Sequence, residues 1–117
     1  MPIKRECEYD ECPVEAAIDL IGGRWKTMIM ALLMEKTLRF NELQRQLKGV
    51  THRVLSAQLR DLEHCGLIGR QVFAEVPPKV EYSITELGTS LRPLIAELRK
   101  WGTEFAIAAK RNSNKAD

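Results

Sequence analysis

The sequence predicts one mostly helical α+β domain, in which short helices precede a β-hairpin and a long last helix. The chain has 117 residues, about the size of one domain, and is 44% hydrophobic and 29% charged, as globular proteins are. Apolar residues recur at helical spacing through most of the chain, and one segment near residue 80 alternates as a strand does. Residues 1–117 are therefore expected to form a single domain.

The first expected helix follows an acidic N-terminal arm, residues 1–11. Pro13 suits the first helical position, Cys12 is then the N-cap, and Gly22 and Gly23 end the helix. The apolar residues of this helix are predicted to be buried: Val14, Ala17, Ile18 and Ile21.

Two further helices are expected before residue 50. The second helix is predicted to be hidden inside the domain because it carries an apolar stripe at helical spacing: Trp25, Met28, Ile29, Leu32 and Leu33. Residues 37–39 are expected to be a short connection. They lead to a brief third helix, which ends near Gly49 and has one apolar side: Phe40, Leu43 and Leu47.

The fourth helix has the clearest boundaries in the sequence. Thr51 is a good N-cap, and Gly66 suits the position just after the helix. One face is a narrow apolar seam, which is expected to be core: Leu55, Leu59 and Leu62. The opposite face collects small or basic side chains and is expected to bind a partner: Arg53, Ser56, Ala57, Arg60 and His64.

Residues 67–84 predict a β-hairpin. Two β-rich runs flank a turn that contains two prolines, residues 77–79. In the second run the apolar residues Val80, Tyr82 and Ile84 alternate with polar ones, as in a half-buried strand.

A long last helix is expected over residues 85–111, with Thr85 as its cap. Its apolar residues follow alternating spacings of four and three, which is a heptad seam: Leu87, Leu91, Leu94, Leu98, Trp101, Phe105 and Ala108. Such a helix is about 40 Å long, more than a domain of this size can cover, so the seam predicts a partner chain. Pro93 is expected to kink the helix or to split off its first two turns.

This order of elements predicts a winged helix-turn-helix, with residues 40–66 as the helix-turn-helix and residues 67–84 as the wing. The chain as a whole carries a net charge of only +2. Between Arg39 and Arg60, however, five basic residues accompany one acidic residue, Glu42, which gives a local net charge of +4. Because basic side chains bind phosphates, this segment predicts double-stranded DNA as the partner.

Individual roles on the DNA follow from side-chain chemistry. Arg53 and Arg60 can reach guanine or phosphate, Ser56 is an adaptable hydrogen-bonding group, and Ala57 permits close approach to a thymine methyl group. His52 lies beside the groove entrance. The full set of expected DNA-binding residues is Arg39, Thr51, His52, Arg53, Ser56, Ala57, Arg60 and, on the wing, Lys79.

Three motifs span most of the chain, from Cys12 to Gly102: CPVEAAIDLIGGRWK, RFNELQRQLKGVTHRVLSAQLRDLE with the following GLI, and VPPKVEYSITELGTSL with the later WG. In this order they resemble the HxlR-type transcriptional regulators, relatives of the MarR group. The resemblance implies a homodimeric DNA-binding regulator from a bacterium or an archaeon, with the Thr51 helix as recognition helix and Lys79 on the wing. It also implies that the first and last helices build the dimer, which gives these interface residues: Val14, Ile18, Leu91, Leu94, Leu98, Trp101 and Phe105.

Cys12 matches an N-terminal cysteine that senses oxidants or electrophiles in some members of that family. Two interpretations stay open, since the helix dipole favours a thiolate at the N-cap whereas the nearby acidic residues disfavour it. Cys12 is either a redox-sensing thiol, with Cys7 as a candidate resolving partner, or a structural cap. Cys65 is expected to be a buried apolar residue. The cysteines lack the short paired spacings of a zinc site, so no metal or cofactor is expected.

The function predicted from the sequence is a homodimeric transcription regulator that binds an inverted-repeat operator and responds to oxidants or electrophiles through Cys12. The alternatives are a regulator that responds to another small ligand, and a winged-helix module that binds protein. An enzyme, such as a thiol oxidoreductase using Cys7 and Cys12, is not expected, because the chain has no C-x-x-C motif. The charged N-terminus and the lack of a long apolar run favour a cytoplasmic location and no membrane partner.

Overall fold

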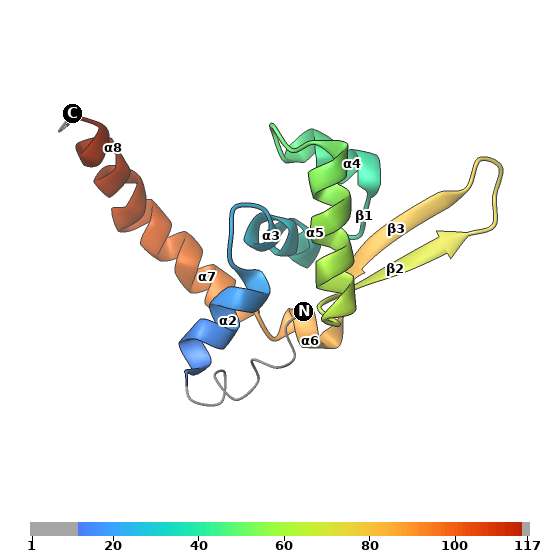
Figure 1. Ribbon diagram of the computed structural model, residues 1–117, viewed down its shortest axis with the longest axis horizontal. Coiled ribbons are helices and arrows are strands. Elements are labelled where there is room, and N and C mark those ends of the chain that lie inside the picture. The colour runs from blue at the N-terminus through green and yellow to red at the C-terminus, as the bar shows by residue number, and fades with distance from the viewer. Residues whose placement is uncertain (1–11, 116–117) are drawn as a thin grey trace.

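The computed structural model describes residues 12–115 and has the predicted α+β architecture (Figure 1). Helices α3, α4 and α5 lie at the centre, the hairpin of β2 and β3 extends from one side, and the C-terminal helices α7 and α8 project from the other side. The elements are α2 (Pro13–Ile21), α3 (Lys26–Glu35), β1 (Leu38–Arg39), α4 (Phe40–Gln46), α5 (His52–His64), β2 (Ile68–Phe73), β3 (Lys79–Ile84), α6 (Glu86–Thr89), α7 (Arg92–Trp101), the π-helical turn η2 (Gly102–Ala106) and α8 (Ile107–Lys115). No helix among the described residues is both long and apolar enough to cross a membrane.

The core lies where α3, α4 and α5 meet. These side chains are almost completely buried: Ile29, Met30, Leu33, Leu43, Leu47, Leu55, Leu59, Leu62 and Ile68. The predicted seam of α5 is therefore confirmed. In α3, however, the predicted stripe is shifted, because Met30 is buried and Met28 is exposed. Helix α3 is covered on more than one side, and its burial does not follow a single stripe.

Helix α5 ends where the sequence predicts. The Thr51 hydroxyl oxygen accepts a hydrogen bond from the Val54 amide at 3.1 Å, which is the expected N-cap. At the other end Gly66 has a positive φ of 81°, and the Leu67 amide donates to the Leu62 carbonyl at 3.0 Å. This is a Schellman ending, which only a glycine adopts without strain.

The sheet has three antiparallel strands in the order β1–β3–β2. The predicted hairpin is confirmed, with Arg70 opposite Tyr82 and Phe73 opposite Lys79. Strand β1 replaces the connection expected at residues 37–39, since Leu38 pairs with Tyr82 and Arg39 with Glu81. Two residues carry too little pattern to predict a strand, and β1 exists only because β3 lies beside it.

Helix α2 differs from the prediction in what it buries. Only Ile21 is buried, whereas Val14, Ala17 and Ile18 are exposed. Cys12 occupies the N-cap position, as expected, but its side chain makes no cap hydrogen bond. The expected burial is therefore confirmed for Ile21 and wrong for the other three residues, which form an exposed apolar face.

The last helix is not continuous. Thr85 caps α6, its hydroxyl oxygen accepting from the Gly88 amide at 3.0 Å, but α6 ends after one turn and α7 begins just before Pro93. The expected split at this proline is therefore confirmed. Leu91, at the break, is half-buried against the chain's own core. Its assignment to the dimer interface stays a prediction.

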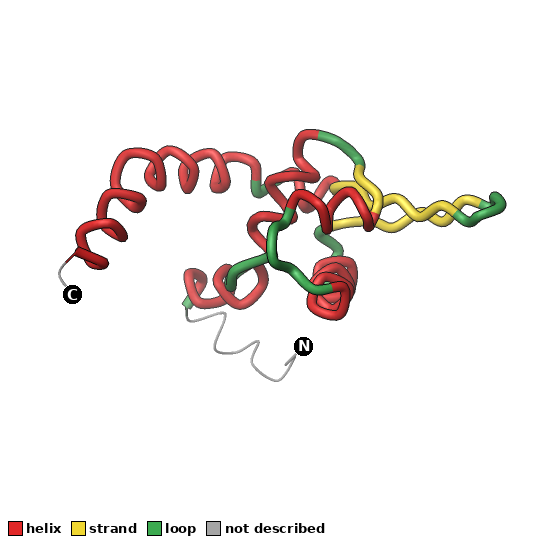
Figure 2. The backbone as a smooth tube through the Cα atoms, turned by 90° about the horizontal axis from the view of Figure 1, so that it is seen from above, coloured by secondary structure: helices red, strands yellow, loops and turns green. Residues whose placement is uncertain are grey.

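Helices α7, η2 and α8 then form one helical run that leads away from the body of the molecule (Figure 2). Ile95 faces the core and is buried. The hairpin extends in the opposite direction, so the two projections lie at opposite ends of the molecule in both views.

Candidate nucleic-acid interface

The solvent face of α5 carries the predicted small and basic residues. Arg53 and Arg60 are exposed, and Ser56 and Ala57 between them are half-buried. Neither guanidinium forms an ion pair with another residue of the described chain. Because the opposite face of α5 is held by the core, this face is fixed in orientation and its two positive charges are available.

The N-terminal end of α5 is packed against α4. The His52 ring contacts the Phe40 ring with centroids 4.5 Å apart. Thr51 is exposed, with its hydroxyl oxygen used by the cap, and Arg39 lies exposed at the junction of β1 and α4. The start of α5, whose free amides suit an anion, is therefore held against the start of α4.

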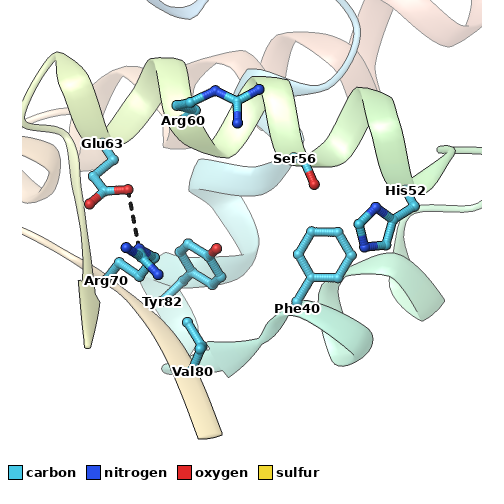
Figure 3. A pocket seen from close by; sticks show the side chains of 8 residues that line it. All are labelled: Phe40, His52, Ser56, Arg60, Glu63, Arg70, Val80 and Tyr82. Carbon is cyan, nitrogen blue, oxygen red and sulfur yellow. Dashed lines mark ion pairs between the residues drawn. The ribbon is translucent and has the colours of Figure 1, made fainter. Parts of the chain in front are cut away.

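A hollow of about 520 Å³ separates α5 from the hairpin (Figure 3). We call it the α5–wing hollow, and its lining residues are Phe40, His52, Ser56, Arg60, Glu63, Arg70, Val80 and Tyr82. His52, Ser56 and Arg60 belong to the predicted DNA-binding set. The other five residues were missed, although the alternation of the predicted strands would have put Val80 and Tyr82 on one face.

Glu63 and Arg70 form an ion pair across the hollow. Glu63 Oε1 lies 3.7 Å from Arg70 Nε, and both side chains are about half exposed. Tyr82 stands next to Arg70 on the adjacent strand. Burial raises the pKa of the Tyr82 phenol, although Arg70 lowers it, and Glu63 raises it further. The phenol therefore stays protonated at neutral pH and can donate a hydrogen bond.

Lys79 begins strand β3 of the hairpin, and its side chain contacts neighbouring residues. Its ammonium nitrogen lies 3.5 Å from Glu81 Oε2, 3.9 Å from Glu75 Oε2 and 4.5 Å from the centre of the Phe73 ring. Binding of DNA phosphate by Lys79 stays a prediction, and it requires the ammonium to leave at least one of these carboxylates.

The two described cysteines differ in exposure. Cys12 is exposed at the start of α2, whereas Cys65 is half-buried at the end of α5 and packs against the core. Cys65 is thus less buried than expected. Cys7, the candidate resolving partner, lies outside the described residues.

The expected dimer residues other than Leu91 are exposed. Their side chains are between 41% and 73% accessible: Val14, Ile18, Leu94, Leu98, Trp101 and Phe105. Two come from α2 and four from α7 and η2. An accumulation of large apolar side chains on a water-exposed surface is typical of a protein–protein interface.

Comparison with known proteins agrees with the fold. The HxlR-like helix-turn-helix family matches residues 20–110. The HTH-type transcriptional regulator YdeP of Bacillus subtilis (strain 168) is 44% identical over 98 residues, which are 84% of this chain and 77% of YdeP.

Solved structures of a redox regulator, HypR, are also similar. The oxidised form is 44% identical, with a TM-score of 0.76 over 79% of this chain and 95% of HypR. The reduced form is 39% identical, with a TM-score of 0.76 over 90% of this chain and 99% of HypR. The family match covers well over half of the residues. This chain therefore belongs to the HxlR-like helix-turn-helix family and is a transcriptional regulator of the helix-turn-helix type.

Proposed function

We propose that this regulator binds a specific inverted-repeat operator as a homodimer, with α5 of each protomer in the major groove. The observation that carries the proposal is the solvent face of α5, where two guanidiniums that form no ion pair with residues 12–115 flank small side chains. An α-helix fits the major groove, where arginine reads guanine edges and small residues allow close approach. On this basis Arg53, Ser56, Ala57 and Arg60 read bases, while Arg39, Thr51, His52 and Lys79 position the backbone.

The homodimer is proposed from the free apolar faces of α2 and α7. A monomer would leave Trp101 and Phe105 in water together with the leucines before them. A second copy would cover these residues with identical ones, as two-fold interfaces do. In such a dimer the two α5 helices lie about 34–36 Å apart, so half-sites are separated by one helical turn of DNA. A footprint over a single half-site would contradict this arrangement.

We further propose that thiol oxidation at Cys12 changes the DNA affinity. The thiol is exposed and makes no cap hydrogen bond, which favours the redox interpretation over the structural cap. The similarity to the redox regulator HypR adds support. Cys12 immediately precedes α2, whose exposed apolar face belongs to the proposed dimer interface. A disulfide formed there would alter the relative positions of the two recognition helices.

The test is a gel shift with the promoter DNA upstream of the gene. Reduced protein and diamide-treated protein are compared, each as wild type and as Cys12→Ser. Diamide accepts two electrons and two protons as it joins two thiols in a disulfide, and a gel without reductant distinguishes a disulfide within one protomer from a disulfide between protomers. We expect oxidation to change the affinity of the wild type and not that of Cys12→Ser.

The other outcomes separate the alternatives. Binding that is unchanged by oxidation assigns the signal to a small ligand and returns Cys12 to a structural role. Loss of affinity in both proteins assigns the effect to another thiol. If reduced protein binds neither the promoter nor any DNA recovered by selection from random sequences, the winged helix binds protein instead.

A further inference from the structure

The α5–wing hollow lies where a DNA strand must pass if α5 enters the major groove. That groove is about 12 Å wide, so an element beside the inserted helix lies over the sugar–phosphate backbone and not over base edges. The hairpin is such an element, and the hollow of about 520 Å³ separates it from α5. The inference rests on the proposed DNA-binding function. It concerns Glu63 and Arg70, which were not among the DNA-binding residues predicted from the sequence.

The chemistry of the lining suits a phosphodiester. Arg60 projects from α5 and Arg70 from β2, and both line the same hollow (Figure 3). Ser56 and Tyr82 add hydroxyl groups. Arginine donates two parallel N–H hydrogen bonds to a phosphate. A phosphate between α5 and β2 would therefore accept hydrogen bonds from Arg60 on one side and from Arg70 on the other.

Glu63 is the acidic residue of the lining, and it forms an ion pair with Arg70. The contact joins Glu63 Oε1 to Arg70 Nε over 3.7 Å, which is too long for a hydrogen bond, and both side chains are about half exposed. Exposed ion pairs of this kind are weak. Breaking the ion pair between Glu63 and Arg70 therefore costs little free energy when a phosphate replaces the carboxylate.

We infer that one strand of the DNA backbone crosses the α5–wing hollow and that Arg70 exchanges Glu63 for a phosphate there. Glu63 then lowers the affinity for every DNA sequence, because it competes with phosphate for Arg70. Removing its charge by Glu63→Gln frees the guanidinium without changing the size of the side chain.

The experiment is a double-mutant cycle on DNA of random sequence and on the operator, with dissociation constants measured over a range of salt. Glu63→Gln should tighten binding to both DNAs alike, by about threefold. Arg70→Gln should weaken binding to both alike and reduce the salt slope by about one phosphate contact, and Arg70→Lys should restore the slope. Glu35→Gln, which removes an exposed carboxylate on α3, is the control and should change neither.

The double variant distinguishes competition from simple repulsion. If Glu63 acts by holding Arg70, Glu63→Gln gives no gain in the Arg70→Gln background. An equal gain in both backgrounds would mean that Glu63 only repels DNA, and the exchange would be overturned. Unchanged binding by all four variants would overturn the inference while leaving the DNA-binding proposal intact. Wild-type protein that binds no DNA would overturn both.

Discussion

Gly88 is the residue at which α6 packs against the end of the sheet. It is buried, and a Cβ atom there would overlap the Leu67 carbonyl oxygen and lie 2.7 Å from Ile84 Cγ1. Neither neighbour can move easily, because one is backbone and the other belongs to β3. The close approach of α6 to the sheet therefore depends on the missing side chain.

Gly88→Ala should lower the free energy of unfolding by about 1–3 kcal/mol, the usual cost of overpacking. The matched control is Gly102→Ala, because nothing lies within 4 Å of a Cβ there and the backbone is helical. That variant should be unchanged or more stable by up to about 1 kcal/mol. Urea unfolding of both variants measures the difference. Equal stability of the two would mean that α6 shifts without cost.

Ionisation of the Tyr82 phenol makes the free energy of unfolding depend on pH in the alkaline range. Its pKa is raised above 10.0 in the folded protein, chiefly by burial. Below the unfolded value the phenol is protonated in both states. Above that value the unfolded chain loses the proton first, so stability falls as pH rises until the folded phenol also ionises.

Tyr82→Phe should make this alkaline decline shallower. The measurement is the urea midpoint of both proteins at several values between about pH 8 and about pH 11, on either side of the tyrosine pKa. Midpoints that fall in parallel would show that Tyr82 does not contribute to the decline.

Among the elements, α5 is the one that sequence predicts best, because its determinants are local. Thr51 and Gly66 fix its ends, and three leucines fix its buried face. The predictions that failed required knowledge of neighbours. Strand β1 depends on β3, and the burial of Met30 depends on what surrounds α3.

The candidate site was likewise predicted only where its determinants are local. The basic face of α5 follows from helical spacing, whereas Arg70 and Glu63 meet only because β2 turns back beside α5. The heptad seam was predicted from Leu87 to Ala108. A π-helical turn adds a residue to the turn, so η2 ends the heptad spacing before Ala108.

At the scale of this helix, Arg53→Ala should weaken binding to the operator by about 1–3 kcal/mol and relax the preference for one base pair. The reason is that Arg53 is exposed on the first turn of α5 and has no ion-pair partner in the described chain. Arg92→Ala, an exposed arginine on α7, is the control and should bind normally. Binding to a library of operator variants measures both effects. A loss that is equal for all sequences would make Arg53 a phosphate contact.

For the molecule as a whole, the distribution of exposed apolar residues predicts dimer formation through α2 and α7. Leu98→Glu should shift sedimentation from dimer to monomer, because a buried unpaired carboxylate is costly in an interface. The fold should survive, since Leu98 is 45% exposed in the single chain. Val72→Glu, at an exposed apolar position on the hairpin, is the matched control and should remain dimeric. A dimeric Leu98→Glu protein would exclude this face.

The three-stranded part of the sheet ends before the hairpin does. Strand β1 pairs only with Tyr82 and Glu81, so the outer half of the hairpin, from Val80 opposite Val72 to the turn, consists of two strands alone. Pairs of residues can therefore be inserted there in register, and each added pair lengthens the hairpin by about 3.3 Å. Neither α4 nor α5 would have to move. The reach of this hairpin along a DNA duplex can thus diverge between relatives, or be engineered, while the base-reading helix stays unchanged.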